Sequence, residues 1–130
     1  MKKLTKNDYA KLYVCTNFAT IYAYMLGLDT KTRFMITSVE IIIADALVDL
    51  GTPRYSYDHV KELTLEDYAK LYECAGFARY YIAGNSIDEL MDVVEYVDGL
   101  LTDILTELGY FKLDYTDQQK LAYEDKECTE

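Results

Sequence analysis

The chain of 130 residues contains no tryptophan, one histidine, one proline and three cysteines. The single histidine, His59, excludes metal sites built from several imidazole ligands. A secreted disulfide scaffold would carry more cysteines, and in pairs, so we expect a reduced cytoplasmic protein. Only six glycines interrupt a composition that is 51% hydrophobic. This combination excludes collagen-like and low-complexity chains and predicts one folded domain over 1–130.

Basic residues are also scarce, at 13 against 23 acids, which gives a net charge of −10. The shortage is concentrated in one half: residues 1–62 hold eight bases and seven acids, whereas residues 63–130 hold five bases and sixteen acids. Such a surface repels phosphate, so we expect neither nucleic acid nor an anionic membrane to be a direct partner. The charge instead favours a basic protein as the partner.

Long apolar segments are missing as well. The start, MKKLTKNDYAKL, has no apolar stretch after its lysines, so we predict no signal peptide. The most apolar run, Ile41–Ala44, ends at Asp45, far short of the length of a membrane span.

Motifs for covalent catalysis are absent. The chain has no Gly-x-Ser-x-Gly sequence, no glycine-rich phosphate loop and no cysteine near a histidine. We therefore expect a non-enzymatic protein without a cofactor. Cys15 and Cys74 fall at matching places on apolar helix faces, where we interpret them as small buried hydrophobes. A redox pair is the alternative interpretation.

The strongest pattern is an internal repeat. Residues 4–27 and 63–86 share twelve identical residues of twenty-four at an offset of 59. After a slip of one residue, ADALVDLG at 44–51 matches TDILTELG at 102–109. We interpret this as a duplication with repeats at 4–62 and 63–121.

Each repeat reads as a helical hairpin. Thr5 and Thr64 precede aspartates by three residues, as in a capping box, and predict helices over 6–26 and 65–84. Gly27 is a candidate C-terminal cap, with Asn85 or Gly84 in that role in the second repeat. The returning helices are expected from Asp29 or Thr30 to Gly51, and from Ser86-x-x-Glu89 to Gly109. Thr116-x-x-Gln119 indicates a further short helix near 117–126.

The apolar face of the first helix is wide enough to contact more than one neighbour. We therefore predict an all-α fold in which two hairpins complete one core, giving a four-helix bundle-like body with pseudo-twofold symmetry. Tyrosine is abundant, at fourteen residues. We expect a repeat-matched set to line the rim of the core with their hydroxyls outward: Tyr9, Tyr13, Tyr22, Tyr68, Tyr72 and Tyr81.

Matched acid pairs on the returning helices suggest one alternative function. Two pairs at i,i+4 spacing, Asp45 with Asp49 and Asp103 with Glu107, would offer oxygen ligands to Mg²⁺. The run DELMDVVEYVD at 88–98 resembles the nucleotide pyrophosphohydrolases of the MazG type in its three-residue spacing of acids. The second glutamate pair of that family is missing here. The resemblance implies a Mg²⁺-dependent all-α nucleotide phosphohydrolase as the alternative.

The larger acidic feature is a stripe in the second repeat. No base occurs between Arg79 and Lys112, and helical periodicity places six acids on one side: Asp88, Glu89, Asp92, Glu95, Asp103 and Glu107. Exposed helices ordinarily interleave bases to relieve such repulsion. A merely solvated face is one interpretation, and a surface that awaits a basic partner is the other. Tyr96 and Tyr110 would add rigid contact area to it.

Our leading hypothesis is a small acidic binding or inhibitor protein that docks on a basic, nucleic-acid-binding protein, such as a nuclease. In size and charge the chain resembles the DNA-mimicking inhibitors that phages direct at restriction enzymes or CRISPR nucleases. A homo-oligomeric helical module, with a homodimer formed through tyrosine-rich faces, is the remaining alternative.

Overall fold

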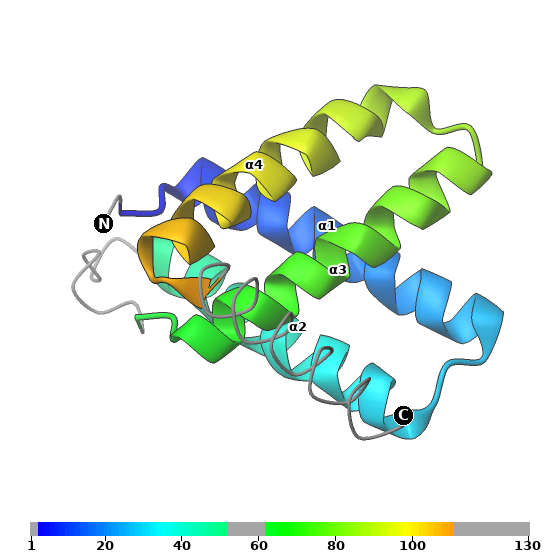
Figure 1. The fold of residues 1–130 in the computed structure, drawn as a ribbon, viewed down its shortest axis with the longest axis horizontal. Coiled ribbons are helices and arrows are strands. Elements are labelled where there is room, and N and C mark those ends of the chain that lie inside the picture. Colours follow the sequence, from blue (N-terminus) through cyan, green and yellow to red (C-terminus); the bar gives the residue numbers. More distant parts are fainter. Residues whose placement is uncertain (1–2, 52–61, 111–130) are drawn as a thin grey trace, which may run out of the picture.

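The computed structural model describes residues 3–51 and 62–110, which contain four α-helices (Figure 1). They are α1 (Lys6–Leu26), α2 (Thr30–Gly51), α3 (Leu65–Gly84) and α4 (Met91–Glu107), with a short 3₁₀ helix, η2 (Asp88–Leu90), before α4. The all-α prediction is confirmed, and the described ranges contain no strand. The expected helix near 117–126, as well as His59 and Cys128, lies outside the described residues.

Local sequence sets the starts of α1 and α3. The hydroxyl of Thr5 accepts a hydrogen bond from the Asp8 amide at 3.0 Å, and Asp8 accepts one from the Thr5 amide at 2.9 Å. Thr64 and Asp67 repeat both bonds at 3.1 Å. Each pair satisfies amides that the helix itself leaves without partners, so both predicted capping boxes are confirmed.

The first hairpin also ends and restarts where the sequence predicts. Gly27 caps α1 in the left-handed conformation, with φ of 62°, which glycine adopts without steric cost. At the start of α2, Oδ1 of Asp29 accepts a hydrogen bond from the Thr32 amide at 2.8 Å. This bond caps α2 in the same manner as a helix N-cap.

Helices α1 and α3 form the centre of the molecule and pack most extensively against each other. In Figure 1 both run from the end that holds the N-terminus toward the two hairpin turns, and α2 and α4 run back. Helix α2 packs on α1 and α4 packs on α3, so the two returning helices lie on opposite sides of the central pair. This placement separates the outer face of α4 from the outer face of α2.

The buried positions recur between the halves. On α1, α3 and the residues before them, eight buried positions match at an offset of 59: residues 4, 8, 9, 12, 15, 16, 19 and 23 with residues 63, 67, 68, 71, 74, 75, 78 and 82. The four buried positions of α2 match buried positions of α4 at an offset of 58: Ile36, Val39, Ile43 and Ala46 with Val94, Val97, Leu101 and Ile104. The apolar repeat of the sequence is therefore a repeat of core positions.

Two tyrosines depart from the expected rim. Tyr9 and Tyr68 are buried in the core rather than placed with their hydroxyls outward. Burial raises the pKa of Tyr68 to about 12, because an ionised phenol would lose its hydration there. Both directly follow a capping aspartate in the first turn of their helix, and both belong to the buried core. The others of the set, Tyr13, Tyr22, Tyr72 and Tyr81, are half-buried as expected.

Candidate functional site

The six acids of the predicted stripe are all exposed, and we call them the acidic face: Asp88, Glu89, Asp92, Glu95, Asp103 and Glu107. The first two lie in η2 and the other four on α4. Since α4 turns its apolar side to α3 and the core, these acids occupy its outer side. The four acids of α4 therefore lie on one side of the molecule, and Asp88 and Glu89 directly precede them along the chain.

The start of α4 differs from the prediction. Ser86 does not cap a helix: its backbone has a φ of 55°, and α4 begins only at Met91, without a side-chain cap. Asn85 ends α3 with a φ of −109°, so the left-handed residue of this turn is Ser86. Ile87 and Leu90 pack against the core from this connection, and their burial outweighs the Ser86 capping pattern. Asp88 and Glu89 therefore precede the α4 stripe rather than extend it.

One acid of α4 lies outside this face, on the side of the helix that borders α3, and is paired. Asp98 lies 3.8 Å from the guanidinium of Arg79 on α3, and both side chains are partly exposed. Arg79 is the last base before the acid-rich segment. The ion pair therefore neutralises the side of α4 that borders α3 and leaves the negative charge on the outer side.

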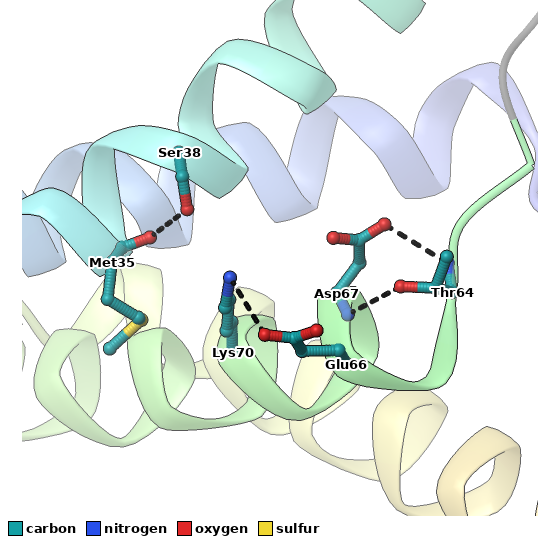
Figure 2. A network of polar contacts seen from close by, with 6 residues as sticks. All are labelled: Met35, Ser38, Thr64, Glu66, Asp67 and Lys70. Atoms are coloured by element: carbon teal, nitrogen blue, oxygen red, sulfur yellow. Dashed lines mark hydrogen bonds and ion pairs between the residues drawn. The ribbon is translucent and has the colours of Figure 1, made fainter.

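Helix α3 shows the contrasting arrangement near its first turn (Figure 2). Lys70 lies 3.4 Å from Glu66, one helical turn away, beside the capping box of Thr64 and Asp67. Such a pair relieves the local charge, and exposed pairs of this kind contribute at most about 1 kcal/mol to stability. Helix α4 contains no base with which its acids could make a pair of this kind.

Tyr96 is committed to an internal contact. Its hydroxyl donates a hydrogen bond to Oδ1 of Asp8 at 2.6 Å, and the amine of Lys11 lies 3.8 Å from the centre of its ring. The bond to Asp8 raises the pKa of Tyr96, since it stabilises the protonated phenol beside a carboxylate. The residue remains 40% exposed, so part of it is available to a partner although its hydroxyl proton is donated to Asp8.

Tyr110 is less available than the sequence suggests. It is half-buried and packs against the hydrophobic core just after α4 ends. Gly109, with φ of 83°, makes the turn that precedes it. The structure therefore gives Tyr110 a packing role, and the exposed aromatic residue near the acidic face is Tyr96.

The alternative metal ligands do not converge. Asp45 and Asp49 lie on α2, and Asp103 and Glu107 lie on α4, on the other side of the central helix pair. Within 3–51 and 62–110, no three or more acidic, histidine or cysteine side chains form a group that could hold a metal ion. The sequence pairs therefore match in the repeat without meeting in space.

Cys15 and Cys74 are both free and buried, in the interface between α1 and α3. Burial raises the pKa of each thiol to about 12, and for Cys74 the nearby Cys15 contributes further. Because the thiolate is the reactive form, these side chains are chemically inert in the folded protein. The packing interpretation of the two cysteines agrees with this environment.

Two features of the surface were not predicted from the sequence. The contacts of Tyr96 join residues more than eighty positions apart, and no local signal reveals such a contact. The apolar residues Phe34, Ile41 and Val48 on α2 are exposed, and their spacing of seven was a readable signal.

Comparisons with known proteins do not assign a function, so a functional proposal depends on the residues described above. The chain matches no family model, no curated protein and no solved structure. In the part of the chain that the structure describes, no helix is both long enough and apolar enough to cross a lipid bilayer.

Proposed function

We propose that the protein is a non-enzymatic binder whose acidic face docks on a basic surface of a nucleic-acid-binding protein, in place of the nucleic acid. The observation that carries this proposal is the exposure of all six acids of the face in a segment without any base. A nuclease or a restriction enzyme of an infected bacterium would offer a basic surface of this kind. Under this proposal the protein acts in the cytoplasm, as an inhibitor.

Electrostatic cost supports the proposal. Like charges one turn apart destabilise a helix by a few tenths of a kcal/mol per pair, and Asp92 with Glu95 is such a pair on α4. A basic partner would relieve this repulsion on binding and would be attracted over a long range at low salt. Acids one helical turn apart are also separated by about 6 Å, close to the phosphate spacing along one nucleic-acid strand.

We also infer that the two halves, 4–62 and 63–121, arose by duplication and are related by a pseudo-twofold axis. Reciprocal ring contacts support this inference: Phe18 stacks on Tyr81 at 5.4 Å, and Tyr22 stacks on Phe77 at 5.8 Å. Phe18 matches Phe77, and Tyr22 matches Tyr81, at the repeat offset. An exchange of matched residues across an interface is typical of twofold symmetry. The acidic face would then be a feature acquired by one copy.

The experiment is a charge reversal of three acids, Asp88, Asp92 and Glu95, each to lysine. Immobilised wild-type and variant chains would capture proteins from a lysate of the native host, and the captured protein would then be purified. We expect the variant to fold, as judged by circular dichroism, and to lose that partner. Wild-type affinity should fall about tenfold or more between 50 and 500 mM salt, because screening shortens the range of the attraction.

A matched control separates the face from the total charge. Reversal of Glu62, Glu66 and Glu73, three exposed acids at and before α3, changes the net charge by the same amount. This control should bind the purified partner nearly as well as the wild type. Equal loss in both variants, or an affinity that ignores salt, would contradict the proposal.

A further inference from the structure

The outer face of α2 carries an apolar seam. Phe34, Ile41 and Val48 are 70%, 55% and 67% exposed, although each is a large hydrophobic residue. They are seven residues apart, so they follow one line along the helix at intervals of about 10 Å. Single exposed apolar residues are ordinary, but three in register form an apolar row along the helix.

The seam lies opposite the side of α2 that packs in the core. Helical periodicity of 100° per residue places Ile41 on the reverse side from Ile36, Val39, Ile43 and Ala46, the buried residues of the helix. Smaller residues, Thr37, Ala44 and Gly51, alternate with the three large ones along the same side. Large and small residues at this spacing are the pattern by which one helix packs against another.

Helix α4 shows that the fold does not require this seam. At the repeat offset of 58, the positions of Phe34, Ile41 and Val48 correspond to Asp92, Gly99 and Thr106. These three residues are polar or small and are also exposed to solvent. The same place in the hairpin is therefore compatible with a hydrophilic surface, and the apolar character of α2 needs a separate reason.

We propose that the seam binds the seam of a second copy of this chain, with the two α2 helices antiparallel and their twofold axis at Ile41. In this register Ile41 meets Ile41 of the second copy, and Phe34 meets Val48. Between these contacts, the small residues Thr37 and Ala44 of the two copies lie beside each other. The surface is thus complementary to itself, as a twofold interface requires.

Charge favours this orientation. Lys31 lies near the start of α2 and Asp49 near its end, on the same flank of the seam. An antiparallel register centred on Ile41 places Lys31 of one copy beside Asp49 of the other at both ends of the interface. A parallel register would place Lys31 of one copy and Asp49 of the other at opposite ends of the interface, so these opposite charges could not pair.

The position of the acidic face also favours a second copy here. Helices α2 and α4 lie on opposite sides of the molecule (Figure 1), so a dimer formed through α2 keeps the two acidic faces far apart. Contact through any surface that includes α4 would oppose like charges. The dimer would present two acidic faces outward, and it does not depend on what those faces bind.

Sedimentation equilibrium of the full chain tests the interface. We expect the wild type to reach twice the mass of one chain at micromolar concentration. Ile41→Arg should weaken dimerisation at least about tenfold, because it buries two guanidinium groups against each other. Gly99→Arg is the matched control on α4: its side chain would meet open space, and it should leave dimerisation unchanged.

A charge exchange tests the orientation. Lys31→Glu and Asp49→Lys should each weaken the dimer, and the double variant should restore it, because the opposite charges meet again across the antiparallel pair. A wild-type chain that stays monomeric would overturn the proposal. The seam would then be covered by another segment of the chain or by another protein. A dimer that tolerates Ile41→Arg, or one without rescue in the double variant, would overturn it as well. Reversal of acids on α4 should leave the dimer intact even if it abolishes partner binding.

Discussion

The hydroxyl of Tyr96 lies 2.6 Å from Oδ1 of Asp8, and this hydrogen bond joins α4 to the first turn of α1. The other carboxylate oxygen of Asp8 accepts the Thr5 amide in the capping box. One side chain therefore both starts α1 and holds α4. In the second half, Asp67 makes the same capping bond, but Ser38 stands at the position matching Tyr96 and donates to the carbonyl of Met35 at 2.7 Å (Figure 2).

Removal of the hydrogen bond between Tyr96 and Asp8 should lower the stability of the fold by a small but measurable amount. We expect Tyr96→Phe to lower the free energy of unfolding by about 0.5–1 kcal/mol, since the bond is partly exposed to solvent. Urea denaturation followed by circular dichroism measures the change. Tyr80→Phe is the matched control, because it removes a hydroxyl from an exposed ring on α3 and keeps the ring stacked near Tyr22.

The same bond predicts a dependence on pH. The folded protein raises the pKa of Tyr96 above the ordinary value, so the phenol holds its proton more tightly when folded. The stabilisation is therefore complete below about pH 10 and decreases as pH rises through the folded-state pKa. The difference in unfolding free energy between wild type and Tyr96→Phe should shrink in that range. A difference that stays constant or grows there would contradict the assignment.

The two capping aspartates should differ in importance. Asp67→Ala removes a capping bond and should cost about 1 kcal/mol, whereas Asp8→Ala also removes the acceptor of Tyr96 and should cost more. A double-mutant cycle with Tyr96→Phe isolates the extra cost as a coupling of about 0.5–1 kcal/mol. Tyr96→Phe should show no coupling with Asp67→Ala.

Matched core positions should respond alike to truncation. Leu12 and Leu71 are equivalent in the repeat, and both are essentially inaccessible to solvent. We expect Leu12→Ala and Leu71→Ala each to cost about 2–5 kcal/mol, because each leaves a cavity in the same central interface. Chemical denaturation measures both. A cost below about 1 kcal/mol at either position would show that the residue is not part of the core.

The buried thiols should become reactive only on unfolding. In a Cys128→Ser background, a thiol reagent should label Cys15 and Cys74 at a rate that follows global unfolding, since both thiols are buried with a pKa of about 12. Because unfolded thiols ionise at an ordinary pKa, stability should fall as pH rises from about 9 toward 12. Rapid labelling of the native chain at neutral pH would contradict the buried placement.

Much of the local structure is readable from the sequence. The bounds of α1, α2 and α3, both capping boxes and the turn at Gly27 follow from short-range hydrogen bonds and backbone preferences. The second turn is not readable in this way, because the partly buried Ile87 and Leu90 pack against the core and α4 starts beyond Ser86. A capping pattern is worth about 1 kcal/mol, and burial of two large apolar residues exceeds it.

The candidate site divides in the same way. Helical periodicity alone identifies which acids share the outer side of α4, because side chains three and four residues apart lie on one face. Contacts between distant segments are a matter of tertiary packing. That packing ties Tyr96 to Asp8 and Lys11, places Tyr110 against the core and pairs Asp98 with Arg79.

The sequence by itself determined four helices, the capping boxes of α1 and α3 and an apolar pattern that recurs between the halves. Each of these depends on neighbours within about one turn, so local order suffices. Only the tertiary structure decided that α1 and α3 form the centre and that the outer faces of α2 and α4 point apart. The physical reason is that a wide apolar face can be buried by several partners, and the choice among them depends on how all the helices fill one core together.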